Sequence, residues 1–136
     1  MKKSIYNILK ECSEPKSVKE RVAKLQQYGL PVVQQILKYA FDPNIKFLLP
    51  EGDPPYKPNE YVDQEGILFS EARKLYLFVE GGNSNLTKNK REMLFIQFIE
   101  GIDKNDAILI CAIKDKKLPF KSLTKDIVKQ AFPNLY

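Results

Sequence analysis

The chain has 136 residues, enough for one domain with a sizeable core, and 43% of them are hydrophobic, as in an ordinary soluble globular protein. It carries 22 Lys and Arg against 17 Asp and Glu, and the resulting formal charge of +5 favours an anionic partner. It has no His and two Cys, which excludes a zinc site built from these residues and catalysis by a histidine base.

The two cysteines, Cys12 and Cys111, each fall on the apolar stripe of a predicted helix, so we expect buried free thiols in a reducing compartment. The first 15 residues have basic side chains but no continuous apolar core, and no apolar run is long enough to span a bilayer. We therefore expect a cytoplasmic protein with no membrane partner.

Three short amphipathic helices are predicted before residue 43. Ser4 begins the first and Pro15 ends it, while Ser17 with Glu20 forms a capping box for the second, in which Val18, Val22 and Leu25 are expected to face inward. Gly29 ends the second helix, and the third begins at Pro31.

Residues 44–66, which we call the strap, are rich in proline and lack a helical period. The first interpretation is a structural one, in which an apolar run near Phe47 covers the helical core and the rest crosses the surface. The alternative is a protein-binding loop with Phe47, Tyr56 and Tyr61 as aromatic anchors.

The helical period returns at Ile67 and continues to Gly81, which predicts one helix. Thr87 caps the next, whose apolar residues run almost all round, so residues 88–102 are expected to form the central buried helix. Its first turn carries Lys88, Lys90 and Arg91, which lie at the wrong end for the helix dipole. These charges indicate either a solvated face or a cluster held for an anion.

Residues 103–133 read as a helix capped by Asp103, a lysine-rich bend and a short helix ended by Pro133. Ser122 or Thr124 can cap the short helix. A helix N-terminus beside lysines is physically suited to phosphate, because N–H groups, dipole and side-chain charge point at one place. The predicted phosphate-binding residues here are Lys114, Lys116, Lys117, Lys121, Ser122, Thr124 and Lys125.

The predicted fold class is therefore all-α. We expect a single compact domain, residues 1–136, of about six or seven helices with a long extended proline-rich loop. Acid pairs such as Asp103 with Asp106 are explained by helix capping, so no catalytic residue, metal site or cofactor is predicted.

The segments ILKYAFDPNIKFLLPEG and KNKREMLFIQFIEGIDKNDAILICAIKDKKLPFKSLTKDIVKQAFPNL resemble the all-helical N-terminal DNA-binding domain of phage and related ATP-dependent DNA ligases. Over nearly its whole length, through FDPNIKF, PPYKPNE, KREMLF, AIKDKK and KQAFP, the chain resembles a family of small uncharacterised proteins of T-even-like marine phages. The first resemblance implies DNA binding by the helix and bend of residues 103–133, and the second implies the cytoplasm of an infected host.

Two departures limit what the ligase resemblance implies. No Lys-x-Asp-Gly motif occurs, so there is no nucleophile for adenylation and no ligase activity is expected. The Gly-x-Ser loop of the ligases is replaced by Lys117-Leu118-Pro119-Phe120-Lys121-Ser122, which has no glycine for close backbone approach to a phosphate.

Two functions are expected from these residues. The first is a non-catalytic module that binds duplex DNA through its phosphates, with Lys88, Lys90 and Arg91 extending the grip of the bend. The second is a protein-interaction adaptor in phage replication or host takeover, in which the strap makes the contact and the lysines only solvate the surface.

Overall fold

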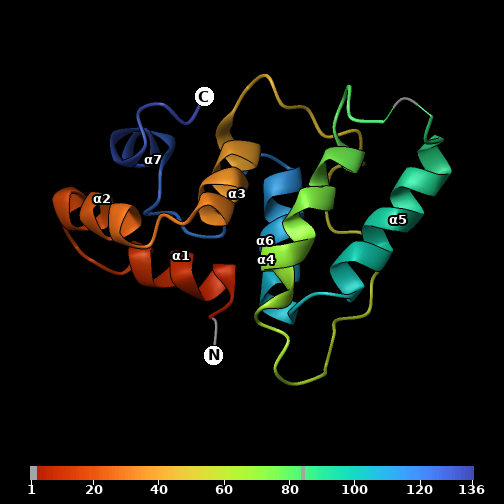
Figure 1. Ribbon diagram of the computed structural model, residues 1–136, viewed down its shortest axis with the longest axis horizontal. Coiled ribbons are helices and arrows are strands. Elements are labelled where there is room, and N and C mark those ends of the chain that lie inside the picture. The colour runs from red at the N-terminus through yellow and green to blue at the C-terminus, as the bar shows by residue number, and fades with distance from the viewer. Residues whose placement is uncertain (1–2, 84) are drawn as a thin grey trace.

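A computed structural model describes residues 3–83 and 85–136 (Figure 1). Within these ranges the chain forms seven α-helices and one 3-10 helix, and its β-structure is a single isolated bridge, which confirms the all-α prediction. The helices are α1 (Ile5–Ser13), α2 (Val18–Gln27), α3 (Pro31–Phe41), α4 (Ile67–Glu71), the 3-10 helix η1 (Ala72–Phe78), α5 (Lys88–Glu100), α6 (Lys104–Lys114) and α7 (Lys125–Ala131).

Short polar side chains begin most of the helices, as the sequence predicts. The hydroxyls of Ser4, Ser17, Thr87 and Thr124 each accept a backbone N–H from the first turn that follows, and a carboxylate oxygen of Asp103 accepts two. Caps of this kind contribute about 1 kcal/mol each. One inward-facing prediction for α2 is wrong: Val18 is 46% exposed, and its neighbours between residues 16 and 20 at the start of the helix are exposed too, whereas Leu25 is buried.

The central helix of the fold is α6, not α5 as predicted. Helix α6 packs against α1, α3 and α5, and its buried apolar residues are Ala107, Leu109, Ile110, Cys111 and Ile113. Helix α5 lies at one end of the molecule (Figure 1), and it buries only Phe95 and Ile99 while Met93 is 57% exposed. We predicted that α5 is buried because apolar residues occur almost all round it. In the structure α5 packs mainly on α6 and η1, and its other side faces solvent.

The helix predicted from residue 67 changes character after one turn. It continues as the 3-10 helix η1, in which Ala72, Leu75 and Phe78 are buried at the spacing of three that this helix type aligns on one face. Val79 is then extended and pairs with Phe47 of the strap. Backbone hydrogen bonds to the strap on either side of that bridge draw the end of η1 out of helical geometry.

The strap itself is irregular, as predicted, and partly covers the core. Phe47 and Leu49 pack against the core, while Leu48 between them is 40% exposed. The ring of Phe47 lies 5.8 Å from that of Tyr39 on α3. This alternation is the pattern of a short extended segment with one face turned inward.

Candidate nucleic-acid interface

The lysine-rich bend begins with a helix-ending motif that usually requires glycine. At the end of α6 the N–H of Lys117 donates to the carbonyl of Ala112, and the N–H of Lys116 donates to the carbonyl of Ile113. This is the Schellman arrangement, whose left-handed position is most often a glycine. Here Lys116 occupies that position with φ of 62°. The local backbone cost is of order 1–2 kcal/mol and has to be offset by other contacts of the same residue.

Those contacts come from the ammonium group of Lys116. Its Nζ donates to the carbonyl oxygens of Tyr39 at 2.6 Å, Asp42 at 2.9 Å and Ile45 at 2.9 Å, and so closes the C-terminal end of α3. Burial lowers the pKa of Lys116, and Asp42 opposes that effect. The side chain of Lys116 therefore holds the bend against α3, and all its donors are occupied within the protein.

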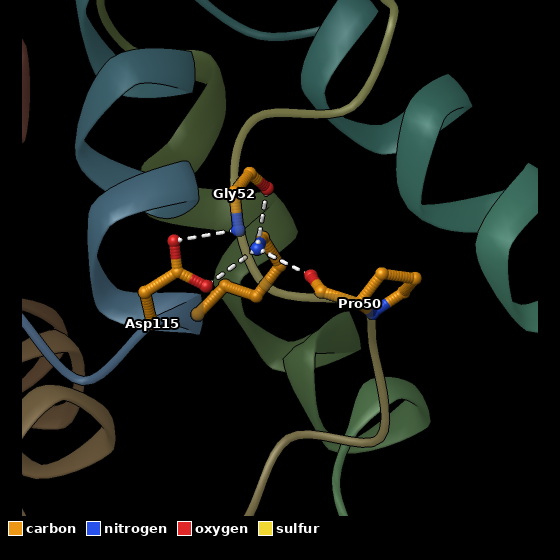
Figure 2. Close-up of polar contacts among 4 residues, drawn as sticks. Pro50, Gly52 and Asp115 are labelled. Atoms are coloured by element: carbon orange, nitrogen blue, oxygen red, sulfur yellow. Dashed lines mark hydrogen bonds and ion pairs between the residues drawn. The ribbon is translucent and has the colours of Figure 1, made fainter.

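Lys114 is occupied in the same way on the other side of the bend. Its Nζ donates to the carbonyls of Pro50 and Gly52, both at 2.8 Å, and to Oδ1 of Asp115 at 2.7 Å. The second oxygen of Asp115 accepts the N–H of Gly52 at 3.2 Å (Figure 2). The Lys114 side chain is 2% exposed, so this lysine, predicted to contact phosphate, instead fixes the strap to α6.

The remaining predicted residues of the bend stay at the surface. Lys117, Lys121 and Lys125 are exposed, and none of them forms an ion pair with a carboxylate in the part of the chain that the structure describes. Ser122 donates its hydroxyl to the carbonyl of Ser13, and Thr124 caps α7. The two hydroxyl groups thus position the bend and α7, while the three lysines present charge.

The second predicted cluster, at the start of α5, lies far from the bend. Lys88 and Lys90 are exposed, and Arg91 donates to the carbonyl of Leu86. Helices α5 and α7 stand at opposite ends of the longest axis (Figure 1). The ten residues predicted to bind phosphate together are therefore divided into three groups. One group lies at each end of the molecule, and the third consists of Lys114 and Lys116, whose ammonium groups are bound inside the protein.

The structure instead reveals a segregation of charge along the fold. Residues 1–41 and 114–136, the basic half, contain 14 Lys and Arg against 5 Asp and Glu. Residues 42–113, the acidic half, contain 8 against 12. Helices α1, α2, α3 and α7 of the basic half lie together on the left of Figure 1, with α4 and α5 on the right. The positive net charge thus belongs to one end of the molecule.

Contacts between distant segments assemble this basic end. Helix α7 packs on α2, where Nε2 of Gln26 donates to the carbonyl of Ala131 at 3.3 Å, and the bend is tied to α1 through Ser13. Lys10, Lys16 and Lys19, which were not predicted as site residues, are exposed on or next to the helices that the bend and α7 contact. The signal that could have found them was the basic excess of the first 41 residues.

A shallow depression of about 580 Å³ lies where the end of α3, the strap and the start of α7 meet. It is lined by four lysines, Lys46, Lys114, Lys116 and Lys125, together with the acidic residues Glu51 and Asp115. Of the four, Lys46 and Lys125 are exposed, whereas the ammonium groups of Lys114 and Lys116 are bound within the protein. In this concave surface Lys125, one of the predicted phosphate-binding lysines, lies near the exposed Lys46 of the strap.

The remaining observations concern the cysteines, possible metal ligands and the length of the helices. Both cysteines are buried and unpaired, as predicted, and burial raises the pKa of Cys12 and of Cys111 to about 11, which keeps the thiols protonated. Across residues 3–83 and 85–136, no group of three or more Cys, Asp or Glu residues is arranged to hold a metal ion. No helix in these ranges is long and apolar enough to cross a membrane.

The fold and this surface define a small all-α protein with one strongly basic end. The chain belongs to a family of unknown function (DUF6433), whose model matches residues 8–119. That match includes the strap, α5, α6 and the first part of the bend, and it ends before Lys121. No curated protein and no solved structure matches the chain.

Proposed function

We propose that this protein is a non-catalytic module that binds duplex DNA through its phosphates with little sequence preference. The observation that carries the proposal is the segregation of charge, which leaves exposed lysines without carboxylate partners at one end of the fold. Contacts of lysine with phosphate position a protein on DNA without reading its bases. The resemblance of the sequence to ligase DNA-binding domains, and to proteins of phages, is in line with this function.

The binding residues proposed are those that the fold leaves available. They are Lys117, Lys121 and Lys125 of the bend and α7, together with the exposed Lys10, Lys16 and Lys19 of α1, α2 and the turn between them. Lys114 and Lys116 support the site by fixing the strap and the bend, rather than by contact with DNA. Lys88, Lys90 and Arg91 are omitted because they lie at the other end.

The test is a fluorescence anisotropy titration of a labelled duplex at about 50 mM and about 200 mM salt. Replacing Lys117, Lys121 and Lys125 together by Gln is expected to reduce the salt slope by about one for each phosphate that is no longer neutralised, and to weaken binding equally for unrelated sequences. The matched control replaces Lys57, Lys88 and Lys104, which are exposed in the acidic half, by Gln.

The control triple variant has the same net charge and is expected to keep nearly the affinity of the wild type. Equal reductions of affinity in the two triple variants would show that net charge, not this surface, controls binding. An absence of saturable binding at about 50 mM salt would refute DNA binding altogether.

A second candidate, the protein-interaction adaptor, retains one of its predicted anchors at the surface. Phe47 and Tyr56 pack against the core, whereas Tyr61 is 83% exposed beside Val62 at 80%. The N–H of Tyr61 donates to Oδ1 of Asn59, and Nε2 of Gln64 donates to the carbonyl of Val62, so the exposed pair is held in place. An adaptor of this kind should show no saturable duplex binding at either salt concentration.

A further inference from the structure

A pocket of about 230 Å³ lies between the strap and α5, and we call it the strap pocket. Its apolar lining comes from both sides: Leu49, Pro54 and Pro55 from the strap, Phe95 and Ile96 from α5. The volume is below the range of about 300–1,000 Å³ that is usual for small-molecule sites. A space of this size suits one long side chain better than a whole cofactor.

Three carboxylates line the same pocket: Glu51 and Asp53 are exposed, and Glu92 on α5 is half-buried. None of the three makes a hydrogen bond or ion pair with any residue in the described ranges. The one cation in the lining is Lys114, and its ammonium group is already satisfied by Asp115 and two strap carbonyls. The pocket therefore combines apolar walls with uncompensated negative charge.

The strap wall of the pocket is held in place before any ligand arrives. Lys114 binds the carbonyls on both sides of Glu51, and Asp115 binds the N–H of Gly52 (Figure 2). On the opposite wall, Glu92, Phe95 and Ile96 are spaced by three and four residues and so share one face of α5. A site whose walls are already ordered loses less conformational entropy on binding.

We propose that the strap pocket is a docking site for a partner protein, and that it receives one arginine or lysine side chain from a basic segment of that partner. The alkyl shank of such a side chain packs on apolar surface while its charged head stays near solvent. Here the shank would lie against Pro54, Phe95 and Ile96, and the head among the three carboxylates. Arginine is also prominent among the anchors that dominate protein interfaces.

This docking site differs from the proposed DNA surface in charge, although the two adjoin: Leu49, Glu51 and Lys114 line both the strap pocket and the depression that contains Lys125. The carboxylates of Glu51, Asp53 and Glu92 repel phosphate and attract a basic segment. The two proposals use side chains of opposite charge, so the failure of one does not imply the failure of the other.

The test uses amide correlation spectra of the ¹⁵N-labelled protein, titrated with the blocked amino acids N-acetyl-arginine amide, N-acetyl-lysine amide and N-acetyl-norleucine amide. The two cationic probes are expected to shift the amide signals of Gly52, Asp53 and Ile96 in a saturable, salt-dependent way. The neutral probe tests the apolar walls alone and should cause smaller shifts. No shift of these signals with either cationic probe would overturn the proposal.

A labelled peptide containing Leu-Arg-Leu then measures affinity by fluorescence anisotropy. Changing Glu51 to Gln, Asp53 to Asn and Glu92 to Gln together is expected to weaken binding about tenfold, since three partly exposed charge pairs are removed. The matched control changes three other acidic residues of the same half, Glu60→Gln, Asp63→Asn and Glu80→Gln, and should bind the peptide as the wild type does.

Two outcomes of this measurement would overturn the docking proposal. If the two triple variants lose affinity for the peptide equally, net charge and not the strap pocket controls binding. Spermidine binding more tightly than the peptide, at the same amides, would make the pocket a polyamine site instead. Far-UV circular dichroism of each variant establishes that it is folded, and the blocked amino acids can be titrated into the wild type even if a variant is not.

Discussion

Replacing the buried lysine that fixes the strap to α6, Lys114→Met, is expected to destabilise the protein strongly. Methionine keeps the length of the side chain but removes an ammonium group that has three oxygen partners. Hydrogen bonds to charged groups contribute about 1.5–3 kcal/mol each, and the desolvation cost of the ammonium offsets a large part of that sum. Asp115 is 14% exposed on its side chain and can regain water, which limits the loss further. We expect the free energy of unfolding to fall by about 2–4 kcal/mol.

The measurement is urea denaturation followed by far-UV circular dichroism, with hydrogen exchange at Gly52 as a local readout. A loss of about 2–4 kcal/mol is a large fraction of the roughly 5–15 kcal/mol by which domains are usually stable. The matched control is Lys117→Met: this neighbouring lysine is exposed, and its change should alter stability by less than about 0.5 kcal/mol. If Lys114→Met unfolds at the urea concentration of the wild type, the contacts of Lys114 with the strap do not stabilise the fold.

Two further predictions concern Asp106 and Gly82. Asp106 is fully buried with Oδ1 accepting the N–H of Tyr6, and burial raises its pKa to about 7. The folded state therefore binds a proton at Asp106 that the unfolded state releases near pH 4, so the contribution of Asp106 to stability should be fully present below that pH and be lost as pH rises towards 7. Asp106→Asn should remove this part of the slope of stability against pH in urea denaturation at several pH values, and an unchanged slope would contradict the assignment. Gly82→Ala would place Cβ 1.7 Å from the carbonyl oxygen of Tyr76, so thermal unfolding should show a loss of about 1–3 kcal/mol, whereas Gly101→Ala meets its nearest atom at 3.4 Å and should change little.

Local sequence signals located most helix ends correctly. Capping residues at Ser4, Ser17, Thr87 and Asp103 act through bonds that span only two or three positions, so they can be read without knowing the fold. The change from α4 to η1 was not predicted, because it depends on the bridge between Val79 and a strap residue far away in sequence.

For the candidate site, local sequence signals did not predict which lysines of the bend are available for binding. Nothing in the sequence distinguishes Lys114 and Lys116 from their neighbour Lys117. In the structure the ammonium groups of both donate hydrogen bonds to carbonyl groups more than 60 residues away. The cluster at Lys88 and Lys90 likewise seemed to extend the bend, but it lies at the opposite end of the fold. A run of charged residues in the sequence therefore does not reveal which of its side chains face solvent.

The sequence by itself determined the all-α class, the starts of the helices, the buried thiols and the irregular strap, because each depends on local periodicity or composition. Only the tertiary structure decided that α6 is central, that the lysines divide into structural and exposed sets, and that charge separates into two halves. Those features depend on contacts between distant segments, as when Lys114 meets Gly52 or Ser122 meets Ser13. Packing brings such groups together through the geometry of the whole core, which no local pattern encodes.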